Sequence, residues 1–296
     1  MKLLSVVTTE GHRLAAKIDS GVLIFSDANS LLSESGSFFP LTLQEIFASG
    51  KDFFQIESRL RSFIADPRVS QYVRPESEIK IAKPFTPHNV ICVGLNYKDH
   101  AEESKIASPE QPVLFAKWTG AMIGPNDPII LPLDTKEVDY EAELAVVIGR
   151  ECSGVRAENA LDYVAGYTCL NDVSARDFQR GDGQWVRAKS QDTFGPFGPY
   201  LVTKDDVPDP QILGITCSVN GRVLQNSNTS KMIFSVRELI AFISRGVTLR
   251  PGDVISTGTP HGVGFAQKPP VFLKAGDQVV VEIKAIGQLS NPVNER

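Results

Sequence analysis

The sequence contains little cysteine, and its cysteines show no metal-binding spacing. Cys92, Cys152, Cys169 and Cys217 lie far apart, with no C-x-x-C pair and no histidine at the spacing of a zinc site. Scattered thiols of this kind are typical of a reducing compartment, where they stay free and mostly buried. The sequence therefore gives no indication of a disulfide framework or a structural zinc ion.

A cluster of positive charge is also missing. The formal net charge is −5 over 296 residues, and no block of lysine and arginine occurs. A protein that binds a nucleic-acid backbone concentrates positive charge on one face. The sequence therefore argues against nucleic acid as the main partner and favours a small or neutral ligand.

No apolar run is long enough to suggest a membrane span. The opening stretch MKLLSVVTTEGHR is interrupted by Glu10, His12 and Arg13, too early for a secretory signal or a spanning helix. We expect no membrane partner and a cytoplasmic location. A mitochondrial location stays open if the source is eukaryotic.

The remaining composition is that of a folded globular protein, with 42% hydrophobic and 22% charged residues. Residues 1–75 predict a small N-terminal α/β domain, because short strand patterns precede a helix that begins at the capping pair Thr42 and Glu45. Prolines at positions 75, 84 and 87 favour extended, poorly hydrogen-bonded backbone and indicate a boundary.

Residues 76–296 predict a larger domain, rich in β-structure. Many short Val- and Ile-rich runs are separated by glycine and proline, and Asn220-Gly221 predicts a tight type I′ hairpin. Helices are expected over residues 157–165 and from Ser235, which forms a capping box with Glu238.

Two glutamates stand at the head of an apolar strand in VDYEAELAVVIG. Side chains two apart in a strand share a face at about 6.6 Å, so Glu141 and Glu143 repel each other by roughly 2–3 kcal/mol. A divalent cation would relieve this repulsion, and carboxylate oxygens favour Mg²⁺, Mn²⁺ or Ca²⁺ over zinc. The alternative from this pair alone is a solvated edge of the strand.

A third carboxylate, Asp172, follows the strand-like run YTCL, at a position where ligands commonly project. It could equally cap the next turn. Arg176 and Gln179 follow it closely, and Lys189 lies further on. An arginine fork suits a substrate carboxylate, whereas a lysine is a point charge that can stabilise an enolate.

A candidate base occurs in VGLNYKDHAEES. His100 and Glu103 are three residues apart and share a face if the segment is helical. A histidine held by a carboxylate can act as a general base. The alternative is a surface histidine with an incidental partner.

The glycine-rich stretch STGTPHGVG lacks the spacing of a P-loop or a dinucleotide fold. It could form a cradle for a small carboxylate or a plain turn, and we interpret its His261 as loop structure.

In combination and in this order, these stretches resemble the fumarylacetoacetate hydrolase family over residues from about 88 to 290. Further stretches that carry the likeness are FAKWTGAMIGP, KSQDTFGPFGP and NGRVLQ. The resemblance implies a β-rich α+β fold, in which a mixed β-sandwich or roll forms the C-terminal domain beside a small N-terminal α/β domain. It also implies a homodimer that binds Mg²⁺ or Mn²⁺ through three carboxylates.

The family's site residues match positions of this chain one by one. The resemblance implies metal ligation by Glu141, Glu143 and Asp172. It implies a catalytic dyad at His100 and Glu103 on a lid segment, and an active-site lysine at Lys189. Substrate contacts are implied for Arg176, Gln179 and Thr259.

The family acts on small 2-oxo and 2,4-dioxo acids, so the resemblance implies such a substrate. Because both dyad residues are present, we place hydrolysis of a C–C bond in an acylpyruvate-type acid first. Decarboxylation or tautomerisation of oxaloacetate, or isomerisation of a 2-hydroxy-diene-dioate, is the alternative. A non-catalytic metal-binding homologue is the third possibility.

Overall fold

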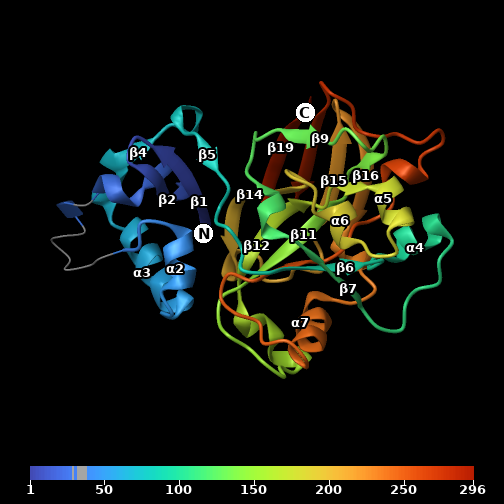
Figure 1. The fold of residues 1–296 in the computed structure, drawn as a ribbon. Helices are drawn as coiled ribbons and strands as arrows, with labels where there is room; N and C mark the ends of the chain where they lie inside the picture. The colour runs from blue at the N-terminus through green and yellow to red at the C-terminus, as the bar shows by residue number, and fades with distance from the viewer. Residues whose placement is uncertain (29, 32–38) are drawn as a thin grey trace.

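The computed structural model describes residues 1–28, 30–31 and 39–296, and within them the chain is mixed α/β and rich in strands (Figure 1). This confirms the predicted β-rich fold class. None of the described helices combines the length and the apolar character that a membrane span requires.

The described residues form a twelve-stranded sheet with the main order β4-β3-β2-β1-β14-β12-β11-β17-β6-β7, in which β5 pairs with β1 and β8 with β14. Its strands are β1 (Lys2–Thr8), β2 (Gly11–Ile18), β3 (Gly21–Ile24), β4 (Val73–Arg74), β5 (Ile81–Ala82), β6 (Val90–Gly94), β7 (Val113–Lys117), β8 (Met122–Ile123), β11 (Ala142–Ile148), β12 (Val164–Asn171), β14 (Gly195–Thr203) and β17 (Val254–Ser256). Most pairs are antiparallel, but β6 runs parallel to β17 and β8 runs parallel to β14.

A second sheet in the described part of the chain has five strands in the order β16-β15-β18-β19-β9. They are β9 (Ile129–Leu131), β15 (Gly214–Val219), β16 (Arg222–Asn228), β18 (Gln278–Ile283) and β19 (Gly287–Glu295). A short ladder joins β10 (Val138–Asp139) to β13 (Ser174–Ala175). The predicted hairpin is confirmed, because Asn220 and Gly221 have φ angles of 52° and 77° between β15 and β16.

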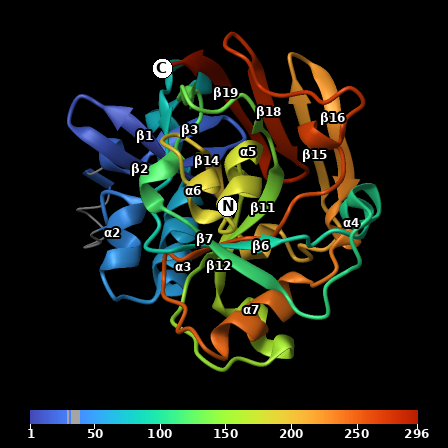
Figure 2. The ribbon, with the colours of Figure 1, turned by 45° about the vertical axis from the view of Figure 1, so that its right-hand side comes forward.

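The helices are short and lie around these sheets. The α-helices are α2 (Leu43–Ala48), α3 (Phe53–Ile64), α4 (Lys98–Ser104), α5 (Arg176–Gly181), α6 (Val186–Lys189) and α7 (Val236–Ser244). The 3₁₀ helices are η1 (Phe25–Ala28), η2 (Pro67–Tyr72), η3 (Glu76–Glu78), η4 (Thr119–Ala121), η5 (Ala157–Tyr163), η6 (Lys204–Asp206), η7 (Thr229–Lys231) and η8 (Gly264–Ala266). Figure 2 shows α5 and α6 side by side.

The predicted helix caps are present. Thr42 accepts a hydrogen bond from the Glu45 amide, and Ser235 forms the full capping box with Glu238. The helix predicted over residues 157–165 is instead the 3₁₀ helix η5, and β12 begins at Val164. The reason is that Val164 and Ala165 are fully buried in the sheet, so packing overrides the helical pattern.

The central strand β11 is buried on both faces, which explains its nearly continuous apolar sequence. Leu144 and Val146 belong to the core shared with the five-stranded sheet. Ala145 and Val147 belong to the core shared with the N-terminal elements. Figure 1 shows this arrangement, with β11, β12 and β14 between the N-terminal elements and the five-stranded sheet.

The N-terminal segment is joined to the rest by hydrogen bonds. Strand β1 pairs with β14, with Lys2 opposite Val202 and Leu3 opposite Leu201. The sheet is therefore continuous from β4 to β7, and the domain boundary at residues 75 and 76 stays a prediction.

Candidate metal centre and active site

The three predicted metal ligands meet where β11 begins and β12 ends. Glu141 directly precedes β11, Glu143 lies within it, and Asp172 directly follows β12. Because the strands are antiparallel with Ala142 opposite Asn171, these positions are neighbours. One carboxylate oxygen from each of the three residues lies within 4.8 Å of the others, and all three side chains are buried. The alternative of a solvated strand edge does not fit this burial.

Glu143 is the carboxylate of the cluster whose charged form is most disfavoured by its surroundings. Burial and the nearby charges of Asp172 and Glu141 raise its pKa well above the usual value. Its Oε2 accepts hydrogen bonds from Ser256 Oγ at 2.5 Å and from the Gly258 amide at 2.9 Å. Among the described residues, no basic group forms an ion pair with it.

Basic side chains contact the other two carboxylates. Lys189 Nζ donates to Glu141 Oε2 at 2.7 Å and to Asp172 Oδ2 at 2.8 Å. Arg176 Nη2 lies 2.6 Å from Glu141 Oε1, and Lys117 Nζ lies 2.8 Å from Asp172 Oδ1. Burial alone would raise the pKa of Glu141, but the charges of Lys189 and Arg176 lower it to about 2.

Asp139 is a fourth buried carboxylate that the sequence analysis missed. It accepts hydrogen bonds from Arg176 Nε at 2.8 Å and from the amides of Gly264 and Phe265 at 2.7 and 3.1 Å. A signal was available, because Asp139, Glu141 and Glu143 are each two residues apart, the repeat of one strand face. Asp139 holds the arginine that holds Glu141.

The sequence analysis also missed Lys117. No spacing around this residue in the sequence connects it with the carboxylates. It lies at the end of β7 and is buried. Its Nζ donates to the Phe194 carbonyl at 2.9 Å and to the Lys189 carbonyl. The same Nζ forms an ion pair with Asp172 Oδ1 at 2.8 Å, so Lys117 joins the end of β7 to the carboxylate cluster.

The donor set fits a divalent cation. Four carboxylates and three basic side chains are buried together in the described structure, and Glu143 is the one carboxylate of the four without an ion pair. The members are Asp139, Glu141, Glu143 and Asp172 against Lys117, Arg176 and Lys189. A buried cluster of three carboxylates, whose oxygens lie this close together, is suited to a hard ion such as Mg²⁺ or Mn²⁺.

The predicted dyad is formed on helix α4. His100 Nδ1 lies 3.3 Å from Glu103 Oε2, one turn along the helix. The Gly262 amide donates to both Glu103 oxygens, at 3.0 and 3.1 Å. His100 is buried, so the alternative of an incidental surface histidine does not fit.

The same helix is anchored by the residue before His100. Asp99 Oδ2 accepts a hydrogen bond from Ser227 Oγ at 2.5 Å and lies 3.1 Å from His261 Nδ1. The glycine-rich loop expected as a cradle or a plain turn thus contacts α4 at two points, Gly262 and His261.

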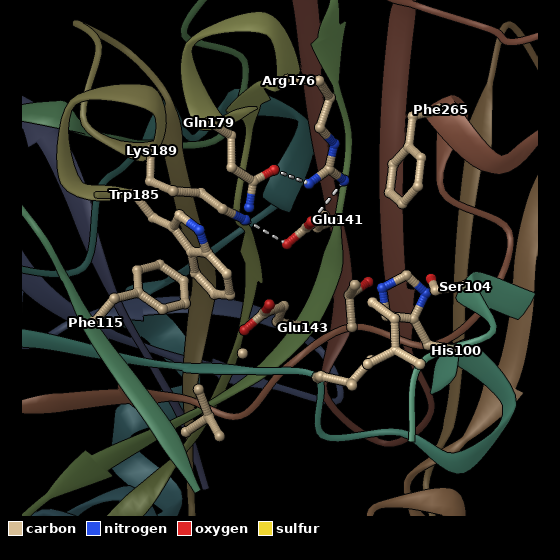
Figure 3. A pocket seen from close by; sticks show the side chains of 15 residues that line it. His100, Ser104, Phe115, Glu141, Glu143, Arg176, Gln179, Trp185, Lys189 and Phe265 are labelled. Atoms are coloured by element: carbon tan, nitrogen blue, oxygen red, sulfur yellow. Dashed lines mark hydrogen bonds and ion pairs between the residues drawn. The ribbon is translucent and has the colours of Figure 1, made fainter. Parts of the chain in front are cut away.

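A cavity of about 230 Å³ joins the carboxylate cluster to the dyad. The sequence-predicted residues that line it are His100, Glu141, Glu143, Arg176, Gln179, Lys189 and Thr259. Glu103 and Asp172 do not line the cavity themselves. Glu103 contacts His100, and Asp172 contacts Lys189. Figure 3 shows Glu141 and Glu143 between Lys189 on one side and His100 on the other.

The predicted substrate contacts differ in their free hydrogen-bonding capacity. Gln179 Oε1 accepts from Arg176 Nη1 at 2.9 Å, while its Nε2 has no partner within the described part of the chain. Thr259 Oγ1 donates to the Ala142 carbonyl at 3.0 Å and accepts from Gln225 Nε2 at 2.8 Å. Gln179 is therefore better placed than Thr259 to donate to a ligand.

We predict that Mn²⁺ binds more tightly as the pH rises above the range in which a glutamate ordinarily ionises. Before the metal binds, the raised pKa of Glu143 leaves a proton on a carboxylate that the cation needs, whereas Glu141 with its pKa of about 2 is already ionised. Calorimetric titration at several pH values, in buffers of different ionisation enthalpy, should show a falling Kd and proton release. The variant Glu143→Gln should abolish that dependence, and a pH-independent affinity of the unaltered protein would contradict the assignment.

The chain is similar to known proteins in sequence and in structure. Residues 89–294 match the protein family described as "Fumarylacetoacetate (FAA) hydrolase C-terminal". The protein is 48% identical over 247 residues to "Oxaloacetate tautomerase fahd2, mitochondrial" of Xenopus laevis, covering 82% of this chain and 77% of the relative.

Solved structures agree with this match. A fumarylacetoacetate hydrolase from Exiguobacterium antarcticum is similar with a TM-score of 0.84 and 36% identity, covering 100% of both chains. A 5-carboxymethyl-2-hydroxymuconate delta-isomerase from Mycobacterium smegmatis is similar with a TM-score of 0.76 and 36% identity, covering 100% of this chain and 99% of that one. The chain therefore belongs to the fumarylacetoacetate hydrolase family.

Proposed function

We propose that this enzyme interconverts the keto and enol forms of a small 2-oxo acid, with oxaloacetate as the first substrate to test. The observation that carries the proposal is the His100–Glu103 pair on the wall of the cavity that also contains the carboxylate cluster. Tautomerisation moves one proton between C3 and the C2 oxygen, which requires one positioned base and no attacking water. The similar proteins named as an oxaloacetate tautomerase and a delta-isomerase support this reaction class.

Hydrolysis of a C–C bond, which the sequence placed first, has weaker support. It rests on the family description and on the name of one similar structure. Hydrolysis also requires a water held beside the distal carbonyl. The alternative expectation of oxaloacetate tautomerisation therefore becomes the leading proposal, and decarboxylation of the same acid is the next to test.

Glu141, Glu143 and Asp172 would hold a Mg²⁺ or Mn²⁺ ion. Such an ion supplies a Lewis acid that draws electrons from the carbonyl and carboxylate oxygens of a 2-oxo acid. The chain's own part is to hold these three ligands close together and to keep Glu141 ionised, which Lys189 and Arg176 favour through their contacts with it.

His100 is the proposed proton carrier. Its Nδ1 is directed to Glu103, so Nε2 is the ring nitrogen left to exchange a proton with a ligand. In the keto-to-enol direction the C3–H bond breaks as His100 takes the proton, and His100 then gives the same proton to the C2 oxygen to form the enol. Glu103 holds the ring and stabilises its protonated form, and the Gly262 amide fixes Glu103.

Lys189 is proposed to stabilise the negative charge that develops on the C2 oxygen. Burial lowers its pKa, but the carboxylates of Asp172 and Glu141 outweigh burial and raise the pKa above the usual lysine value. The ammonium group therefore stays protonated at neutral pH and cannot serve as the base. Gln179 Nε2 is proposed to donate to a substrate oxygen beside it, while Arg176 and Thr259 complete the wall.

We predict that His100→Ala lowers the rate of oxaloacetate tautomerisation by about 10²–10⁴-fold, the usual contribution of a general base. The Kd for Mn²⁺ should change little, because His100 is not among the carboxylate ligands. The rate is followed by the ultraviolet absorbance of the enol, and the affinity by calorimetry. The exposed His12 on β2 offers a matched control, and His12→Ala should keep the normal rate. A His100→Ala enzyme with unchanged turnover would remove the dyad from the mechanism.

We further propose that the enzyme is a homodimer that uses the outer edge of the large sheet. In the described residues the strand order ends at β7, whose free edge could pair with another chain. Apolar side chains gather there, with Leu114, Trp118 and Val247 lining one groove at 38%, 61% and 48% exposure. A second copy would cover this face by a two-fold contact.

We predict that the double substitution Trp118→Glu and Val247→Glu yields a monomer. Dimer formation would then bury two glutamates from each subunit at the contact, where their negative charges repel one another. Light scattering after gel filtration measures the mass. Val223→Glu on β16 is the matched control, since Val223 is 56% exposed and does not line this groove. A double variant that remains dimeric, or an unaltered protein that is monomeric, would contradict the proposed interface.

The cellular location of the protein is proposed from the name of a similar protein. The Xenopus relative is named as mitochondrial, which supports the mitochondrial alternative over the cytoplasmic expectation for a eukaryotic source.

A further inference from the structure

We propose that the cavity also accepts 2-oxo acids with a planar apolar tail, such as arylpyruvates, and that Trp185 forms the wall that binds the tail. The inference concerns the same cavity and therefore rests on the proposed function. It adds a substrate class that extends beyond small dicarboxylic acids.

The cavity wall beyond the carboxylate cluster is apolar. Phe115 and Trp185 form one side, next to Glu143 and Lys189 (Figure 3). Val93, Leu95 and Ile106 also line the cavity. A C4 dicarboxylic acid is charged at both ends and has no apolar group to place against this wall. A flat hydrocarbon group would match it.

The basic side chains that line the cavity are engaged by its carboxylates. Arg176 contacts Asp139 and Glu141, and Lys189 contacts Glu141 and Asp172. Lys189 Nζ also lies 5.3 Å from the centre of the Phe115 ring, so the aromatic wall begins directly beside the place proposed for the 2-oxo acid head. A ligand whose head lies at the carboxylates would thus bring its C3 substituent to Phe115 and Trp185.

Trp185 is held in place by its neighbours rather than being free to turn away. A Cβ added to Gly94 would lie 2.5 Å from Trp185 Cζ3, so the indole packs directly on the glycine backbone. Phe115 meets it edge to face, with ring centroids 5.2 Å apart and planes at 73°. The two rings therefore form a fixed surface, of the kind that discriminates between ligand shapes.

The added reaction is the same proton transfer. In an arylpyruvate the C3–H bond breaks and the C2 oxygen gains a proton, and the new C2–C3 double bond conjugates with the aromatic ring. No oxidant, reductant or second substrate is needed. The enol is planar, so its conjugated tail can lie flat against one ring of the wall.

The kinetic test compares phenylpyruvate with oxaloacetate. Trp185→Ala should lower kcat/KM for phenylpyruvate about tenfold more than kcat/KM for oxaloacetate, the scale of losing a hydrophobic contact in a pocket. Leu133→Ala alters a side chain that is 80% exposed and lies outside both this cavity and the proposed dimer groove, and it should leave the ratio unchanged. Equal losses for both substrates, or no loss for either, would overturn the inference.

A binding test avoids turnover and uses Trp185 as its own reporter. In the Trp118→Phe protein with Mn²⁺, Trp185 is the only tryptophan. Benzoylformate, which has an aromatic tail and no hydrogen at the position of C3, should quench its emission, while oxalate should bind with little quenching because it has no tail. Gly94→Ala, which forces the indole to move, should weaken benzoylformate about tenfold more than oxalate.

The outcomes separate this inference from the proposed function. Oxalate binding without benzoylformate binding, or equal weakening of both ligands by Gly94→Ala, would overturn the tail site and leave the proposed function standing. Failure of both ligands to bind in the presence of Mn²⁺ would overturn the proposed function and the tail site together.

Discussion

Repulsion between three buried carboxylates governs the chemistry of this site and the arrangement of the side chains around it. Glu141, Glu143 and Asp172 each place an oxygen within 4.8 Å of the others, where burial strengthens their mutual repulsion. Neighbouring basic side chains offset part of it, at Glu141 and Asp172. Glu143 is left with neutral donors only, and its pKa rises because burial and its two acidic neighbours disfavour its charge. A divalent cation is the group that would resolve this imbalance.

The fold makes this arrangement possible by enclosing two strands on both faces. Every residue of β11 and β12 is buried, with one core toward the five-stranded sheet and another toward the N-terminal elements. Their antiparallel register brings the head of one strand to the tail of the other, which is where the carboxylates lie. The dyad reaches the same cavity from α4, which the loop around Gly262 holds through Glu103. The cavity therefore combines a proposed cation site, a proposed base and an aromatic wall supplied by separate parts of the chain.

The sequence predicts those parts of the site that repeat with the period of a single element. Glu141 and Glu143 share a strand face and His100 and Glu103 share a helix face, so both pairs could be proposed from spacing, although their roles stay predictions. Asp139 has the same strand spacing and could have been included. Lys117 could not, because its contact with Asp172 joins residues that are distant in the chain. The packing of Trp185 on Gly94 likewise depends on a close approach of two segments that no local pattern records.

Glu141, Glu143 and Asp172 are proposed to bind one divalent cation together. The most direct measurement is the anomalous scattering of Mn²⁺ in crystals of the unaltered protein, compared with crystals of Glu143→Gln grown in the same solution. The account predicts one peak within coordination distance of an oxygen from each of Glu141, Glu143 and Asp172, and its loss or strong weakening in the variant. No peak between these residues in the unaltered protein, or a peak that the substitution leaves unchanged, would contradict it.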